Sequence, residues 1–410
     1  MSMPTALPVL PVLSESAGTD KTALTEPLAP DDWLPLSHPD LSDLEPQLMQ
    51  VALGSPCWSG GALVARFEAA FAASLGRGHA VAVPSGTLGT WLALRALGIG
   101  PGDEVIASAH GWQPVAHAVT HCGARAVFAD IHYWSGCLDP ARAAAHITPR
   151  TKALLVGNVN GHPADWDAWR ALATQHGLAL IEDSTEALGS RYQGRSVGSF
   201  GDVSVFDFAQ PSALCCGEGG MLVTDDPALA SELRYLRART LDDRRSLSVG
   251  ARVPMQSGIS EITAALGLAQ LSRLDEILAR RKAVEQHYLA QMSSFEGIKP
   301  PYVAPGVDEV HWMLYVVHLG KRFSASACAE IIEDLATECI EAAMYSKPLH
   351  QQFAYTQLGH KRGQLPLLER IADRALALPL HGQLTPGHVQ FIVKTLKDSS
   401  LNVGAGAAIY

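Results

Sequence analysis

The 410-residue sequence lacks a long apolar run, a long basic run and any paired cysteine spacing. Without about eighteen consecutive apolar residues, it has no segment expected to span a membrane as a helix. With no basic run and a net charge of −10, it is not expected to bind nucleic acid or an anionic membrane. The seven cysteines are scattered and odd in number, which favours buried thiols in a cytoplasmic protein over a disulfide framework or a metal site.

The first residues also lack the features of a secretory signal, because no basic segment precedes the apolar run and prolines interrupt it. We expect residues 1–35 to form a mobile tail and residues 401–410 a second, shorter one. The remaining length is too great for one small core. A large domain over 36–295 and a smaller α+β domain over 296–400 are therefore expected.

Short apolar runs alternate with helical patterns over much of the chain. The predicted strands are 80–83, 104–107, 126–130, 153–156, 179–182, 203–208 and 220–224, and the predicted helices are 63–75, 87–97, 114–122, 140–145, 166–176 and 227–239. This alternation is typical of an α/β domain with a mostly parallel seven-stranded sheet and helices on both faces. A single long helix is predicted over 257–286, followed by a strand over 311–319 and helices over 324–337 and 384–397.

A polar turn, Pro84-Ser85-Gly86-Thr87, follows the first predicted strand and opens a helix. Amides at a helix N-terminus bind phosphate well, because the helix dipole favours a negative charge there. The same residues are also a good N-cap turn, and by themselves they favour that second interpretation.

Asp183 follows Glu182 at the carboxyl end of a predicted strand. Open α/β sheets bind ligands at this edge, so Asp183 is a candidate ligand-binding carboxylate, with a helix N-cap as an equally good interpretation. His162, in a loop, is expected to be solvated. Cys215 and Cys216 are expected to fill space rather than to react.

The stretch 201–220, GDVSVFDFAQPSALCCGEGG, predicts a buried strand, a proline-interrupted loop and a glycine-rich turn into a second strand. It resembles the pattern GD-x-x-x-F-S-F-H-x-x-K-x-L-x-x-GEGG of the DegT/DnrJ/EryC1/StrS family of pyridoxal phosphate (PLP) enzymes. The segments 84–106, 178–189, 345–350 and 376–384 resemble that family too, so the likeness covers about residues 40–398. It implies an aminotransferase-like fold of type I, a homodimer with active sites at the subunit interface, and a sugar-, cyclitol- or amino-acid-like substrate.

The same resemblance implies a cofactor site. Its cofactor-binding residues would be Ser85, Gly86, Thr87, Trp112, Asp183, Glu186, Gln210, Ser212 and Gln256. In the family, the first three positions bind phosphate, the aromatic residue stacks on the pyridine ring, and the carboxylate at Asp183 holds the pyridinium N–H, which makes the ring a better electron sink. Glu186 would lie near the ring hydroxyl.

Three cofactor contacts of the family are changed in this chain. Ser212 stands where a lysine would form the Schiff base, which serine cannot form, and no lysine occurs between Lys152 and Lys282. Asp207 stands where a serine helps to bind phosphate, and an anion beside a phosphate is repelled by it. Gln256 replaces an asparagine that reaches the partner subunit's phosphate.

Three hypotheses follow from these changes. The enzyme either binds PLP or pyridoxamine phosphate (PMP) non-covalently, with Glu186 or the substrate as proton carrier, or it has lost the cofactor and uses its pocket for another reaction. In the second case the reactive groups would be Asp183, Asp207, Ser212 and Cys216. Ser212, Glu186 and Asp207 are the catalytic candidates. The third hypothesis, a non-catalytic partner or regulator of an active paralogue, is disfavoured because the acidic residues of the pocket are retained.

Overall fold

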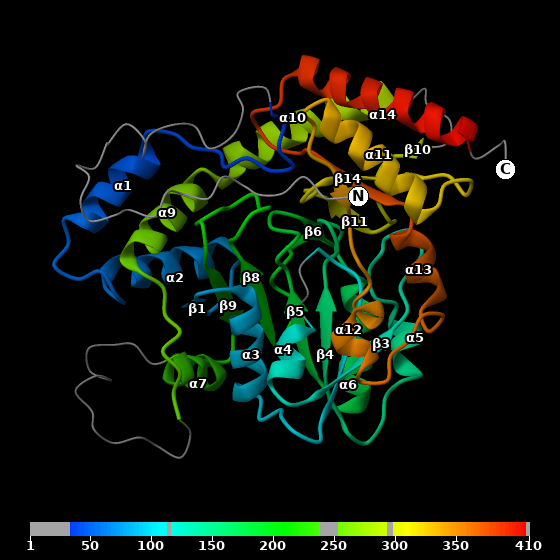
Figure 1. Ribbon diagram of the computed structural model, residues 1–410. Coiled ribbons are helices and arrows are strands. Elements are labelled where there is room, and N and C mark those ends of the chain that lie inside the picture. Colours follow the sequence, from blue (N-terminus) through cyan, green and yellow to red (C-terminus); the bar gives the residue numbers. More distant parts are fainter. Residues whose placement is uncertain (1–32, 113–115, 238–252, 293–297, 407–410) are drawn as a thin grey trace, which may run out of the picture. The chain divides into compact units, whose positions relative to one another are not determined.

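The computed structural model describes residues 33–112, 116–237, 253–292 and 298–406, and the chain from Leu34 onward forms one unit. Its main sheet has seven strands in the order β1-β9-β8-β5-β4-β2-β3 (Figure 1). The strands are β1 His79–Val83, β2 Glu104–Ser108, β3 Arg125–Ala129, β4 Thr151–Gly157, β5 Ala179–Asp183, β8 Val203–Asp207 and β9 Gly220–Thr224. Strand β9 runs antiparallel to both of its neighbours, and the other pairs are parallel. The predicted fold class is confirmed.

Most residues of these strands are small or branched apolar residues that are fully buried, such as Val81, Ile106, Leu154 and Ile181. A sheet that is covered on both faces produces such continuous apolar runs. The helices of this part are α2 Ala62–Ser74, α3 Gly86–Ala96, α4 His117–His121, α5 Pro140–Ala144, α6 Trp166–His176 and α7 Pro227–Arg237. Helix α3 packs against β8 and β9, and it lies with α4 in front of the sheet in Figure 1.

The helix predicted over 257–286 is two helices, α9 (Glu261–Ser272) and α10 (Leu274–Met292), with Arg273 between them. The guanidinium of Arg273 pairs with Asp40 at 2.8 Å and with Glu45 at 2.6 Å. Glu45 lies in the first turn of α1 (Leu44–Leu53), and Asp40 is 233 residues from Arg273. A pairing over such a separation leaves no periodic signal in the sequence, which explains why the break was not predicted.

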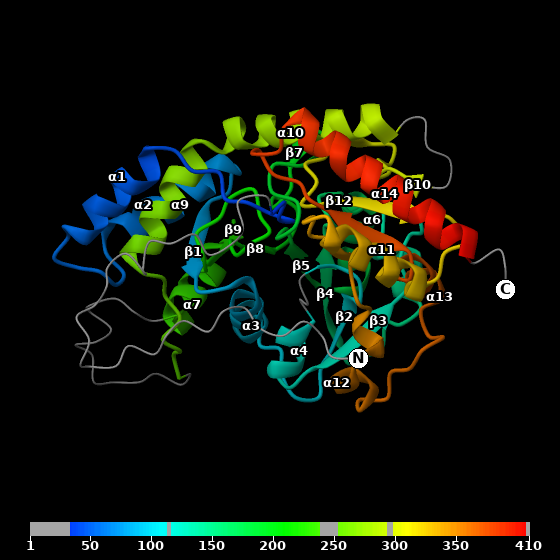
Figure 2. The same cartoon turned by 45° about the horizontal axis from the view of Figure 1, so that its top comes forward.

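A second, antiparallel sheet has the order β10-β12-β14-β13. Its strands are β10 Ile298–Lys299, β12 Tyr315–Leu319, β13 Ala343–Met344 and β14 Ala375–Leu378, and a three-stranded sheet is made of β6 Arg191–Tyr192, β7 Arg195–Ser196 and β11 Val307–Glu309. Helices α11 (Ala325–Thr337) and α14 (Pro386–Gly406) pack against each other beside the second sheet (Figure 2), and the short helices α12 (Phe353–Thr356) and α13 (Pro366–Ala372) lie between β13 and β14 in the sequence. The division of the chain near residue 295 stays a prediction.

Most of the predicted N-terminal tail lies outside the described residues. The amide of Leu34 donates a hydrogen bond to the carbonyl oxygen of Cys339 at 2.8 Å, so the chain is already fixed at this point. At the other end, α14 continues through Gly406, past the helix predicted over 384–397. Within the described ranges, every helix is too short or too polar to cross a membrane.

Candidate active site

Two neighbouring strands of the main sheet end in an acidic residue. Strand β5 ends at Asp183 and β8 ends at Asp207, and the two strands are parallel, with Asp183 opposite Val205. Both carboxylates therefore lie at the carboxyl edge of the sheet, where open α/β sheets bind ligands. Helix α3, which packs on β8, begins at the same edge, so the structure brings the two acids and the predicted loop 84–87 together.

The carboxylate of Asp207 occupies the start of α3. Its Oδ2 atom accepts a hydrogen bond from the amide of Gly86 at 2.7 Å, and its Oδ1 atom accepts one from the amide of Ala209 at 2.8 Å. A Cβ atom added at Gly86 would lie 2.9 Å from the Cβ atom of Asp207, so only glycine fits here. Ser85 is the N-cap of the helix, and its Oγ atom accepts from the amide of Leu88 at 3.2 Å. Both interpretations of this loop thus hold in part: it caps the helix, and it binds an anion that belongs to the chain itself.

This arrangement tests whether the site fits a phosphate. The Gly86 amide, which would bind the phosphate, already donates to a carboxylate. A phosphate placed beside Asp207 would meet a second negative charge in a partly buried position, which is unfavourable unless a proton or cation intervenes. Thr87 is half-buried in the same turn. The residues present therefore do not fit a PLP phosphate held on this loop in the way that the family resemblance implied.

Asp183 is buried, with 5% of its surface exposed, and its Oδ1 atom accepts a hydrogen bond from the amide of Thr185 at 2.9 Å. Burial raises the pKa of Asp183 to about 7, and the negative charges of Glu186 and Asp207 act in the same direction, against the Thr185 hydrogen bonds that lower it. The residues after Asp183 form turns, so its interpretation as a helix N-cap is wrong. A carboxyl group that titrates near neutral pH is suited to general acid–base catalysis.

Glu186 ties three segments of the chain together. Its Oε1 atom accepts from the amide of Trp112 at 2.6 Å, and its Oε2 atom accepts from the amide of Asn160 at 2.7 Å and from the hydroxyl of Tyr345. These donors follow β2, β4 and β13 respectively. Burial, and then the charge of Glu186, raise the pKa of Tyr345, so its proton stays on the hydroxyl. These three hydrogen bonds favour a positioning role for Glu186 over that of a proton carrier.

The loop between β8 and β9 carries Ser212. Its hydroxyl oxygen accepts a hydrogen bond from the amide of Leu214 at 3.3 Å, and the side chain is half-buried. Gln210 and Gln256 are exposed. A contact of Gln256 with a partner subunit stays a prediction.

The cysteine pair of this loop is buried. Burial raises the pKa of the Cys215 thiol and of the Cys216 thiol, which disfavours the reactive thiolate. These observations support the space-filling interpretation of both residues. Trp112 is half-buried, and its ring centre lies 6.4 Å from that of Tyr345 at an angle of 32°.

Sequence reasoning missed Asn160 and Tyr345 and misjudged His162. The Asn160 side chain accepts from the amide of Leu314 at 3.0 Å and donates to its carbonyl oxygen at 3.1 Å, with a backbone φ of 50°. An asparagine before a glycine in a loop was a usable signal for this conformation. His162, expected to be solvated, is buried, and burial lowers its pKa to about 4, because it packs in the loop and accepts from the amide of Ala304 at 3.0 Å.

The structure is similar to solved aminotransferases. The PMP form of the putative sugar aminotransferase Spr1654 from Streptococcus pneumoniae superposes with a TM-score of 0.87 at 25% identity, covering 92% of this chain and 100% of that one. DesV from S. venezuelae, solved in complex with a ketimine intermediate, gives a TM-score of 0.81 at 34% identity, covering 90% and 98%. The fold is thus that of the aminotransferase class of enzymes, PLP fold type I.

The chain belongs to the DegT/DnrJ/EryC1/StrS aminotransferase family, which matches residues 39–397. It is 40% identical to dTDP-3-amino-3,4,6-trideoxy-alpha-D-glucose transaminase of Streptomyces venezuelae over 334 residues, covering 81% of this chain and 86% of that protein. It is 37% identical to GDP-perosamine synthase of Caulobacter vibrioides over 337 residues, covering 82% and 90%.

Proposed function

We propose that this protein is a biosynthetic enzyme that acts on a sugar-type metabolite, linked to a nucleotide, without a covalently held cofactor. The substrate class is supported by the relatives, whose names contain dTDP- and GDP-linked sugars. The absence of a covalent bond to a cofactor is supported by Ser212, which stands where the family has its Schiff-base lysine. No lysine occurs between Lys152 and Lys282.

One observation carries the proposal about the cofactor. Asp207 binds the Gly86 amide at 2.7 Å, where the family resemblance places the cofactor phosphate. The chain thus provides its own anion at that position. This favours a pocket that has been converted to cofactor-free chemistry.

In such a pocket, Asp183 is the proposed proton carrier. Its pKa of about 7 allows it to accept a proton from a substrate hydroxyl or carbon and to return it at another atom. Ser212 would donate a hydrogen bond to the substrate, because its oxygen is already an acceptor for Leu214. Glu186 would hold the pocket walls in place through Trp112, Asn160 and Tyr345.

A second candidate function uses PLP or PMP bound non-covalently. The retained carboxylate of Asp183 at the sheet edge favours it, because that group is placed to hold a pyridinium N–H. A solved neighbour in its PMP form also shows that this family fold holds the aminated cofactor. In this reaction Glu186 or the substrate would have to move the proton.

The protein is also proposed to be a homodimer. Leu41, Val51 and Trp58 are exposed in the N-terminal segment, and Val253 (81% exposed) and Met255 lie next to Gln256. Large apolar side chains gathered in such segments are a common feature of subunit interfaces. The arrangement supports an interface formed by these segments, with Gln256 near the partner subunit.

The test combines spectroscopy with turnover. The purified full-length protein is recorded in the near-ultraviolet and visible range before and after PLP or PMP is added and dialysed away, and is then incubated with dTDP- and GDP-linked keto sugars under mass spectrometry. Turnover without a cofactor band supports the proposal, and a retained band supports the second candidate. The absence of both, together with stimulation of an active paralogue, would instead identify a non-catalytic partner. Asp183→Asn must abolish turnover under either enzyme hypothesis.

A further inference from the structure

Residues 34–40, which we call the N-terminal strap, are attached to two other parts of the molecule. The carbonyl oxygen of Leu36 accepts a hydrogen bond at 3.0 Å from the amide of Leu380, in the turn that follows β14. The carboxylate of Asp40 pairs with the guanidinium of Arg280, on α10, at 2.6 Å. The strap leads into α1, so these bonds also fix the place where α1 begins.

The imidazole of His381 is buried beside the strap. Only 3% of its surface is exposed, and neither ring nitrogen has a hydrogen-bond partner among the described residues. Its ring centre lies 5.6 Å from that of His38, an exposed residue of the strap. A Cβ atom added at Gly382 would lie 3.0 Å from the Oδ2 atom of Asp40, so the strap and this turn are closely packed. A buried polar group without a partner is costly, and it costs far more when it is charged.

The charges around His381 are unfavourable for an imidazolium. The guanidinium of Arg281 lies close by, because its Nη1 atom donates to the carbonyl oxygen of Leu380 at 2.7 Å. Burial lowers the pKa of His381 to about 4, and the charges of His38 and Arg281 act in the same direction, against the carbonyl oxygen of Pro35. The ionisable side chains around the ring and the strap are His38, Asp40, Arg273, Arg280, Arg281, Glu341 and His388.

Both carboxylates of this set already have partners. Asp40 pairs with Arg273 at 2.8 Å as well as with Arg280. The Oε2 atom of Glu341 accepts a hydrogen bond from the amide of Leu36 at 2.7 Å. A proton on His381 would therefore lack a counter-ion as long as the strap is in place.

We propose that His381 makes the N-terminal strap a pH-dependent latch, which is closed while the imidazole is neutral and opens when the imidazole takes up a proton. Opening lets water hydrate the imidazolium and separates it from the positive charge of its neighbours. Because the strap leads into α1, the same step releases the N-terminal side of that helix. The latch goes beyond the proposed function, because it involves none of the residues of the acidic pocket.

The latch weakens as the pH falls. With the strap closed, the pKa of His381 is lowered to about 4, whereas an exposed histidine has an ordinary pKa of about 6.5. The open state therefore binds more protons, so the stabilisation of the closed state is fully present above about pH 6.5 and is lost as the pH falls towards 4. Between about pH 7.5 and pH 5.5 the open fraction should rise about tenfold. Carboxylates with ordinary pKa values stay charged in this range.

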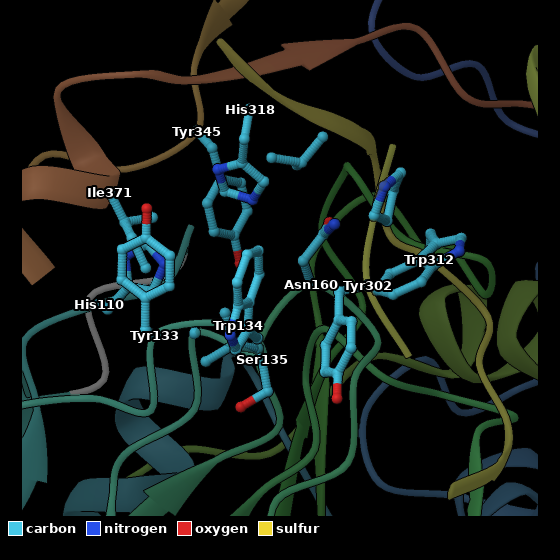
Figure 3. A pocket seen from close by; sticks show the side chains of 14 residues that line it. His110, Tyr133, Trp134, Ser135, Asn160, Tyr302, Trp312, His318, Tyr345 and Ile371 are labelled. Atoms are coloured by element: carbon cyan, nitrogen blue, oxygen red, sulfur yellow. The ribbon is translucent and has the colours of Figure 1, made fainter. Parts of the chain in front are cut away.

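Other buried histidines also respond to acid, but at a different place. His110 and His318 line a cavity of about 30 Å³ (Figure 3), and burial lowers the pKa of His110 to about 3 and that of His318 to about 4. Neither is among the groups that act on His381. Their effect is on the stability of the whole fold, which can be measured separately from the opening of the strap.

The test is hydrogen exchange of the full-length protein at about pH 7.5 and pH 5.5, expressed as protection factors, which remove the pH dependence of the exchange reaction itself. The amides of Leu36 and Leu380 report on the strap, and the amides of β4 report on the whole fold. The strap amides should lose protection about tenfold at the lower pH and should be less protected than β4 at both pH values. Unchanged protection of the strap, or strap amides as protected as those of β4, would overturn the latch.

Variants assign the effect to His381. His381→Phe keeps a flat ring, loses no hydrogen bond and cannot take up a proton, so its strap should be equally protected at the two pH values. His381→Leu is a second variant that cannot titrate. The control His388→Gln removes an exposed neighbouring histidine and should keep the tenfold loss. A tenfold loss in both His381 variants would contradict the assignment. So would a wild-type NMR titration in which the His381 ring has a midpoint of about 6.5 while the strap stays protected, whether or not the variants fold.

Discussion

The Oδ2 atom of Asp207 lies 2.7 Å from the amide nitrogen of Gly86, at the first turn of α3. A helix N-terminus carries free amides and a partial positive charge, so it takes up an anion readily. Here the anion is a side chain fixed in the chain, and it loses no translational freedom when it binds. A phosphate must displace that carboxylate or lie next to it.

We predict that two substitutions are needed to restore a Schiff base. Ser212→Lys alone supplies the amine but leaves Asp207 on the Gly86 amide. Ser212→Lys/Asp207→Ser also frees that amide for a phosphate. With equimolar PLP, the double variant should show the visible absorbance band of a Schiff base, and the single variant should show little of it. A full band in Ser212→Lys alone would mean that Asp207 does not obstruct the phosphate.

Asp207→Ser alone should create an anion site. The variant loses the acceptor of two amide hydrogen bonds, from Gly86 and Ala209, and should be less stable by about 1–3 kcal/mol. Inorganic phosphate at millimolar concentration should then raise its melting temperature, because a ligand that binds only the folded state stabilises it. Wild-type protein under the same conditions, with chloride at equal ionic strength as the reference, should show no such rise. Equal responses of the two proteins would contradict this account.

The stability of the protein should depend on pH through Asp183. Its folded-state pKa is raised from 3.8 to about 7, so the folded protein keeps a proton that the unfolded chain has lost over this range. The stabilising contribution of the protonated Asp183 carboxyl group is fully present below about pH 4 and is lost as the pH rises towards 7. Asp183→Asn removes this term, so the variant should gain stability relative to wild type between pH 4 and pH 7, on the order of a few kcal/mol.

Denaturant unfolding of both proteins at pH 4.5 and pH 8 measures that difference. Buried histidines also make stability depend on pH; His110 is one, since burial lowers its pKa to about 3. Their contribution is the same in both proteins, so it cancels in the difference between them. A difference in stability that is the same at both pH values would show that Asp183 titrates normally.

Loss of Glu186 should loosen the pocket. Glu186→Ala leaves the amides of Trp112 and Asn160 and the hydroxyl of Tyr345 without their acceptor. Because each buried unpaired group costs about 1–3 kcal/mol, unfolding should become easier by about 3 kcal/mol or more. Tyr345→Phe removes one of the three bonds and should cost about 1 kcal/mol. If Glu186→Ala unfolds at the same denaturant concentration as wild type, the three hydrogen bonds do not hold these segments together.

The sequence was sufficient to predict the main sheet, because each of its strands is a short apolar run. The place of Asp183 at the end of β5 followed from the same runs, whereas the strand predicted over 203–208 runs one residue past Asp207, where β8 ends. What could not be predicted depends on contacts between distant residues. The turn of Asp207 towards Gly86 is one such contact, over 121 residues, and the bond between Glu186 and Tyr345 is another, over 159 residues.

The same limit explains the unpredicted break at Arg273 and the unexpected burial of His162. At Arg273, where the helical pattern breaks, the guanidinium pairs with Asp40 and Glu45 from a distant part of the chain. His162 looks like a surface histidine in its loop, yet the segment that buries it contains Ala304 and comes from a later part of the chain. Local periodicity carries no information about either partner.

The carboxylate at the start of α3 also bears on how such a protein can change over generations. A lysine at position 212 would supply an amine, but Asp207 would still occupy the Gly86 amide. A serine at position 207 would free that amide, at the loss of two hydrogen bonds from the fold, and would supply no amine. Under the account given above, a Schiff base therefore requires both changes together, so the two positions constrain each other.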